Sequence, residues 1–317
     1  MNLKKISVFA TLGLCIAIAG CNSEEATEAP SQAVSSEQGF IQKYNAYVEV
    51  ANSLHTPFYR ALSDYQTVYE PAVRSGKKLD NYSVVSLVSI KNTQEKLKSA
   101  LALEANMPEI DGPAKQFDDS LTKLAPLNSE LNNYAESKEF LTDGGKKAAD
   151  NNEAFVNALT EVVQAEAAFL QGIQKQDEIN IQTSFDKAPK DSMEHYRLGA
   201  VLFSKQAMNK VDAIFEQQGA KESIPPFQES LDQAAAMISN WDKKFKEETP
   251  QGCPRIMSKM NEFLAQGRSV IQHASEGNYV PQEGSISWQI NNPIKNDASS
   301  LQLKFNAMIG ALNYPRC

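Results

Sequence analysis

The sequence predicts an all-α protein, an antiparallel up-down bundle of about eight helices. Three observations predict it. From residue 40 onward, apolar residues recur at steps of three, four and seven, the spacing that places one apolar stripe along a helix. The alternating pattern of a half-buried strand is nearly absent, and its one short candidate, residues 285–290, is assigned to a loop. Short connections indicate that successive helices are antiparallel neighbours.

Glycine, proline and polar clusters divide the body into helical segments. The expected helices cover residues 40–74, 82–105, 111–141, 146–180, 190–218, 225–248, 254–275 and 295–314. Pro57, Pro71 and Pro126 fall inside these segments and are expected to kink or interrupt them. The pattern leaves open whether residues 40–180 and 190–317 form two bundles or one elongated bundle.

Composition and charge narrow the class of protein. The chain has 317 residues, is 42% hydrophobic and 22% charged, and contains enough aromatic side chains for a sizeable core. Its formal charge of −8, without a basic block, argues against nucleic-acid binding, which depends on neutralising phosphates. With three His and four Cys, the chain offers little material for a metal site, and we expect no metal and no cofactor.

Residues 1–20 have the order of an export signal. Lys4 and Lys5 precede an apolar run from Val8 to Ala19, which is shorter than the roughly 20 residues that a bilayer-spanning helix needs. Ile18-Ala19-Gly20-Cys21 resembles the lipobox of bacterial lipoproteins, which implies lipidation of Cys21 as the mature N-terminus. The alternatives are a simple secretory signal with a stray cysteine and a cytosolic protein with an apolar start.

Residues 21–39 are expected to form a flexible tether, because they contain almost no large apolar side chain to bury. The helical domain would then occupy residues 40–317. A lipidated Cys21 would anchor the protein to the bacterial cell envelope, facing the periplasm. Asn22, rather than Asp, follows the cysteine and by resemblance to enteric sorting favours the outer membrane.

Cys253 and Cys317 remain once Cys15 leaves with the signal and Cys21 is acylated. One precedes an expected helix and the other follows the last, so antiparallel packing of these helices would bring the two cysteines together. In an oxidising compartment such thiols tend to pair, and we expect a disulfide. The alternative is two free thiols.

Sequence motifs for catalysis are missing: there is no phosphate-binding loop, dinucleotide fingerprint, nucleophile elbow or HExxH. His273 and Glu276 share one helical face and resemble a motif of imelysin-like helical envelope proteins, but no second His matches them. We therefore interpret His273 as a satisfied or solvated side chain and expect no enzymatic activity.

Three residues are candidate ligand contacts. Tyr44-Asn45-Ala46 and Phe305-Asn306-Ala307 repeat one pattern, each followed seven residues later by another Asn. Asn45 and Asn306 would either grip a ligand or, as we favour, bond between the terminal helices. Trp288 lies in a long loop, where it either packs on the bundle or offers a recognition surface. Residues 138–147 either contact an anion or saccharide or, as we favour, form a helix stop, a glycine turn and a helix start.

Several of these features together look like one family. Cys21 after an acidic tether, Tyr44-Asn45-Ala46-Tyr47, Tyr134 with Lys138 and Asp143, Cys253 with Phe263, and Phe305-Asn306-Ala307 resemble the YiiG-like bacterial lipoproteins, a family of unknown function. The resemblance implies an envelope lipoprotein with a helical body and supplies no catalytic or binding residues. We expect a lipid-anchored interaction or scaffold module. A small-ligand or ion-binding lipoprotein is the alternative, and an imelysin-like metal-dependent hydrolase is third.

Overall fold

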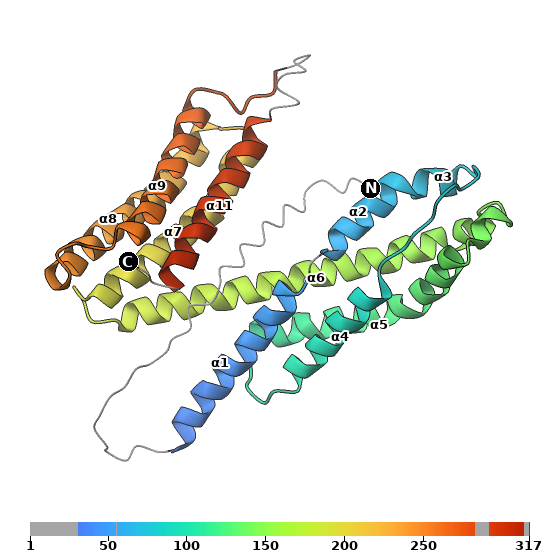
Figure 1. The fold of residues 1–317 in the computed structure, drawn as a ribbon, viewed down its shortest axis with the longest axis horizontal. Helices are drawn as coiled ribbons and strands as arrows, with labels where there is room; N and C mark the ends of the chain where they lie inside the picture. The colour runs from blue at the N-terminus through green and yellow to red at the C-terminus, as the bar shows by residue number, and fades with distance from the viewer. Residues whose placement is uncertain (1–30, 55, 283–291, 314–316) are drawn as a thin grey trace. The chain divides into compact units, whose positions relative to one another are not determined.

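The computed structural model describes residues 31–54, 56–282, 292–313 and 317. Within these residues the chain forms ten α-helices and two short 3-10 helices, without a β-strand, so the predicted all-α class is confirmed (Figure 1). The described residues divide into two compact units, which answers the question that the sequence leaves open. Unit 1 extends to Gln176 and unit 2 begins at Asp177, so the chain passes from one unit to the other within the long helix α6 (Lys146–Lys187).

Unit 1 is built from the first five helices and the N-terminal part of α6 (Figure 1). These helices are α1 (Ser31–Asn52), α2 (Phe58–Val68), α3 (Glu70–Arg74), α4 (Leu87–Leu101) and α5 (Pro108–Glu136). Aromatic side chains form much of its core: the rings of Phe58 and Phe117 meet edge to face at 5.8 Å, and those of Tyr47 and Phe169 at 5.9 Å. Edge-to-face contacts of this kind stabilise beyond the area that they bury.

The prolines explain why the expected helix 40–74 is three helices. Pro57 has no N–H and precedes the first residue of α2, and Pro71 lies in the first turn of α3, positions where the missing donor costs little. By contrast, α5 continues through Pro126, so this proline does not divide the helix. The first helix also begins at Ser31 rather than at residue 40, so it includes residues assigned to the tether.

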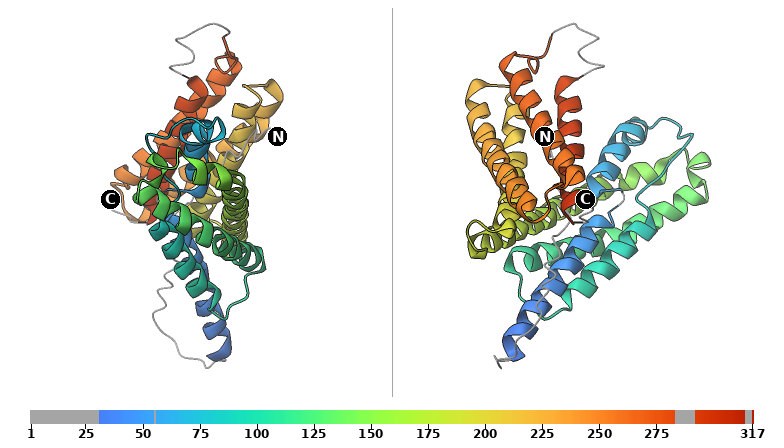
Figure 2. Two further views of the ribbon diagram at one scale, coloured as in Figure 1. Left: turned by 90° about the vertical axis from the view of Figure 1, so that its right-hand side faces the viewer. Right: turned by 60° about the vertical axis from the view of Figure 1, so that its left-hand side comes forward.

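Unit 2 is a group of four long helices that run alongside one another, preceded by the last turns of α6 (Figure 2, right). They are α7 (Met193–Glu216), α8 (Ile224–Glu248), α9 (Pro254–Ser275) and α11 (Pro293–Asn313). Gly219, which has a positive φ, lies in the turn after α7, at a place where a Cβ would lie 3.1 Å from the main chain of Ala274. Ser192 caps the start of α7 by accepting the N–H of His195.

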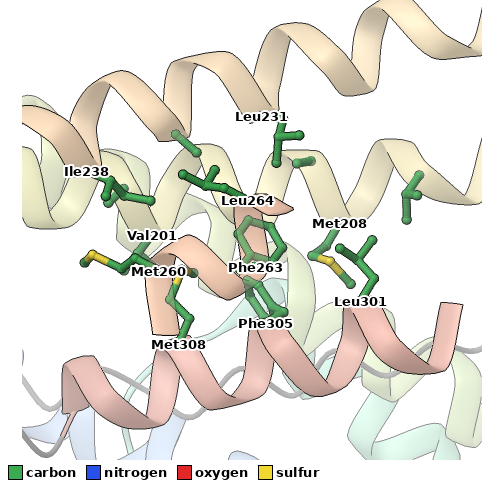
Figure 3. Close-up of a cluster of buried hydrophobic side chains, with 14 of the residues drawn as sticks. Val201, Met208, Leu231, Ile238, Met260, Phe263, Leu264, Leu301, Phe305 and Met308 are labelled. Atoms are coloured by element: carbon green, nitrogen blue, oxygen red, sulfur yellow. The ribbon is translucent and has the colours of Figure 1, made fainter. Parts of the chain in front are cut away.

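The core of unit 2 lies where the apolar stripes of these helices meet. Phe263 of α9 and Phe305 of α11 face each other, and Leu231 and Ile238 of α8 lie above them (Figure 3). Phe263 and Phe305 are fully buried, and their ring centroids are 5.8 Å apart. Removing one such ring typically costs about 3–5 kcal/mol of stability. The periodicity therefore predicts both the helices and the faces that they bury.

No helix among the described residues is long and apolar enough to cross a lipid bilayer.

Candidate functional site

Three polar side chains surround a buried carboxylate of unit 2, that of Asp297 in the first turns of α11. Asp297 is only 8% exposed, and three side chains converge on its two oxygens. Gln266 Nε2 donates to Oδ1 at 3.0 Å, while the Tyr279 hydroxyl donates to Oδ2 at 2.6 Å. His273 Nδ1 lies 2.6 Å from the same Oδ2. An ionised carboxylate only accepts hydrogen bonds, so His273 carries its proton on Nδ1.

The backbone explains how these residues meet. Gln266 and His273 lie two turns apart on one face of α9, and Gly277, with φ +75°, turns the chain directly after this helix. Tyr279 follows this turn and is fully buried, with its ring edge-on to Phe215 at 5.6 Å. Asp297 thus joins the end of α9, the turn that follows and the start of α11.

Burial sets the protonation state of the tyrosine in this cluster. Burial first, and then the hydrogen bond to Asp297 and the charge of Asp297, raise the pKa of Tyr279 far above its usual value. The phenol therefore remains a hydrogen-bond donor across the ordinary pH range. The cluster holds a negative carboxylate in a buried place by surrounding it with donors, as buried charges require.

The chemistry available to the cluster is that of an oriented imidazole. The carboxylate holds Nδ1–H, and the remaining ring nitrogen, Nε2, would accept a proton, as in the His–Asp half of hydrolytic triads. The His273 side chain is 38% exposed, so solvent reaches it. A triad also needs a nucleophile bonded to the second ring nitrogen. Within the described residues, the hydrogen bond of His273 goes to Asp297 and its ring contact is with Tyr279, so it has no hydrogen bond to a Ser or Cys side chain.

His273 and Glu276, which the sequence places on one helical face, do not form a shared site in the structure. Glu276 accepts hydrogen bonds from Gln272 Nε2 at 2.8 Å and Asn278 Nδ2 at 3.2 Å, whereas His273 turns to Asp297. In the part of the chain that the structure describes, no group of three or more His, Cys, Asp or Glu side chains could hold a metal ion. The sequence pattern offers no signal for the pairing of His273 with Asp297, because 24 residues separate them.

The predicted ligand contacts lie in different parts of the chain. Asn45 lies exposed on α1 in unit 1, and Asn306 lies exposed on α11 in unit 2, where it accepts a hydrogen bond from Gln302 of its own helix. In both copies of the pattern the aromatic residue is buried instead, Tyr44 in one and Phe305 in the other. Trp288 and Cys21 lie outside the described residues. A ligand role for Asn45, Asn306 and Trp288 stays a prediction.

The expected disulfide is present. Cys253 caps the start of α9 and Cys317 follows α11, and their sulfur atoms are bonded at 2.06 Å with the Cα atoms 4.6 Å apart. Cys253 is 1% exposed. The pairing confirms that α9 and α11 run antiparallel, with these two ends meeting.

The turn at residues 138–147 has the structural form that we favour. Lys138 adopts a left-handed conformation, and Gly144 and Gly145 both have positive φ. Asp143 accepts hydrogen bonds from the N–H groups of Gly145 and Lys147, at 2.8 and 3.0 Å. This carboxylate thus takes the donors at the start of α6 that would otherwise attract an outside anion.

Comparison with known proteins places the chain. A family model described as a protein of unknown function, DUF3829, matches residues 38–314. The uncharacterized protein YiiG of Escherichia coli (strain K12) is 22% identical over 221 residues, which cover 67% of this chain and 63% of that protein. The aligned part thus spans less than two thirds of its relative. No solved structure matches the chain significantly. With a family match over nearly the whole helical body, the chain belongs to the DUF3829 family, a group of YiiG-like proteins whose function is unknown.

Proposed function

We propose that this protein is a lipid-anchored component of the bacterial cell envelope, attached through Cys21, and that its helical body is a non-enzymatic interaction or scaffold module facing the periplasm. The order of Lys4 and Lys5, an apolar run, small residues and Cys21 supports the anchor. Two or more acyl chains on one residue give stable membrane attachment.

The observation that carries the envelope location is the disulfide. Cys253 and Cys317 are bonded between two helix ends of unit 2, and disulfides persist in oxidising compartments such as the periplasm. This support is independent of the N-terminal sequence. An exported chain also provides the compartment in which the pairing would form.

The use of three carboxylates supports a structural rather than a chemical role for the body. Asp297 receives three side-chain donors, Asp143 receives Tyr134 and two main-chain N–H groups, and Glu166 receives two main-chain N–H groups. Each joins segments of its own unit. Carboxylates that are satisfied in this way hold helices together and have few lone pairs left for a substrate.

The anchor is tested by replacing Cys21 with Ser in the full-length chain and fractionating the cells. We expect the wild type in the membrane fraction and Cys21→Ser in the soluble fraction. Cys253→Ser is the matched control, because it also removes one cysteine and should remain in the membrane. Membrane retention of Cys21→Ser would refute the anchor, and mass spectrometry of the mature N-terminus would show directly whether acyl chains are attached.

The interaction role is tested in intact cells with a photo-crosslinking residue placed at exposed positions of each unit. Asn45 and Asn306 are suitable, since both side chains face solvent. The expected result is a discrete adduct with the same protein from one of the two positions, reduced when Cys21→Ser releases the chain from the membrane. Hydrolytic turnover that depends on His273 would refute the non-enzymatic proposal.

A further inference from the structure

Glu166 is a carboxylate buried in unit 1 and used to hold a different helix. It lies on α6 and is 2% exposed. Its Oε1 accepts the N–H of Phe58 at 3.1 Å, and its Oε2 accepts the N–H of Tyr59 at 3.2 Å. These are the first N–H groups of α2, which begins directly after Pro57. The first N–H groups of a helix have no partner within it, so Glu166 satisfies two donors that α2 cannot satisfy itself.

No Lys or Arg of the described residues pairs with Glu166 to compensate its charge. The charged side chains on the surrounding helices of unit 1 either face solvent or pair with other residues. Arg60 and Asp64 of α2 are exposed. The pairs are Glu161 of α6 with Lys123, Asp118 of α5 with Lys98, Lys43 of α1 with Asp111, and Glu49 of α1 with Lys96. Burial therefore raises the pKa of Glu166 to about 7, and the two main-chain N–H groups offset only part of this rise.

The element that Glu166 holds is flanked by non-helical chain. Residues 53–54 and 56–57 precede α2, and residues 75–86 follow α3. A second polar contact fixes the other end of this pair of helices: Tyr65 donates to Asn152 Oδ1 at 2.9 Å, and Asn152 lies 3.4 Å from Glu70. Asn152 and Glu166 are about four turns, or about 20 Å, apart along α6. The α2–α3 element is thus attached to α6 by polar groups at two separate points.

We propose that Glu166 is a pH-sensitive latch, which holds the start of α2 on α6 while it is neutral and favours release of that end once it is ionised. The end of the element at Asn152 stays attached, because neither Asn152 nor Tyr65 changes charge in the neutral range. Release exposes the apolar side chains of Phe58 and Leu62, which are buried in the closed form.

The direction of the pH effect follows from proton binding in the two forms. In the open form Glu166 is hydrated and titrates near its ordinary pKa of 4.5, whereas in the closed form it titrates near 7. Between these values the closed form holds a proton that the open form has lost. Raising the pH from 5 to 8 therefore favours opening, by about 10- to 100-fold.

Hydrogen exchange of the full-length protein between pH 5 and pH 8, corrected for intrinsic exchange rates, tests the latch. We expect amide protection in α2 to fall by about 10- to 100-fold across this range while that of α4 and α5 changes little. Glu166→Gln keeps the shape and acceptor oxygen of the side chain but does not titrate, so its α2 protection should be independent of pH. Glu161→Gln, an exposed position on the same helix, is the matched control and should keep the wild-type profile.

Three results would overturn the proposal. One is amide protection in α2 of the wild type that does not change with pH. The second is a pH dependence of α2 protection in Glu166→Gln that equals that of the wild type, because this variant retains every other titrating group, including all three histidines. The third is an equal loss of protection in α2, α4 and α5, which would indicate unfolding of the whole unit. If circular dichroism shows that Glu166→Gln is unfolded, the comparison of α2 with α4 in the wild type still decides between latch and no latch.

Discussion

Gly172 of α6 marks a close approach of α6 to the start of α5, and replacing it with Ala tests that packing directly. A Cβ at this position would lie 2.3 Å from the carbonyl oxygen of Glu109 and 3.2 Å from its carbonyl carbon. Both are main-chain atoms, and the Cα of Ile110 would be 3.4 Å away. A side chain could rotate out of the way, but a main chain moves only if the two helices separate.

The net effect on stability combines two opposing terms. Ala is more favourable than Gly in a helix interior by about 1 kcal/mol, which stabilises the variant. Forcing extra volume into a packed contact costs about 1–3 kcal/mol, and a main-chain obstacle places the cost toward the upper end. We expect Gly172→Ala to lower the free energy of unfolding by about 2 kcal/mol.

The measurement is urea unfolding followed by circular dichroism at 222 nm, with Gly39→Ala as the matched control. Gly39 is also helical, in α1 of the same unit, but a Cβ there would meet nothing within 4 Å. The same chemical change should therefore stabilise at Gly39 by about 0.5–1 kcal/mol. If Gly172→Ala also stabilised the protein, the close approach of α5 and α6 would be refuted.

Two further predictions concern unit 2. Cys317→Ser opens a loop with a sequence separation of 64 and should lower the free energy of unfolding by about 4 kcal/mol. A reductant should lower the unfolding midpoint of the wild type but not that of the variant. Equal sensitivity of the two proteins to the reductant would argue against the disulfide. Tyr279→Phe removes the buried hydroxyl that donates to Asp297 and should lower the free energy of unfolding, measured in urea, by about 1.5–3 kcal/mol. The control is Tyr196→Phe, which removes a hydroxyl that donates to the exposed Asp191 and should change stability by less than about 1 kcal/mol. Equal effects of the two tyrosine substitutions would show that burial of the hydrogen bond does not matter.

Local sequence patterns predict much of this fold. The stripe through Leu231, Ile238 and Trp241 predicts both the helix and its buried face, because helical periodicity is a property of neighbouring residues. The positions of Cys253 and Cys317 at helix ends predict their pairing once the helices are antiparallel. Helix ends that depend on prolines are less predictable: Pro57 separates two helices, whereas Pro126 lies inside one.

The contacts of the candidate site, unlike the helices, are not predictable from local sequence patterns. His273 stands out in the sequence because Glu276 follows it three positions later on the same helix face, yet its carboxylate partner is Asp297 on another helix. Glu166 carries no local signal at all, since its partners Phe58 and Tyr59 lie more than 100 residues earlier in the chain. Contacts between distant segments arise from packing, and spacing along the chain does not encode them.

Sequence alone determined that this chain is helical, where most helices begin and end, which faces they bury and which two cysteines meet, because each follows from short-range periodicity and chain direction. Only the tertiary structure decided that the helices form two units, that α6 continues from one to the other, and that Asp297 and Glu166 hold helices far away in sequence. The physical reason is that a buried carboxylate takes whichever donors the fold brings within about 3 Å, and that choice is made by packing in three dimensions.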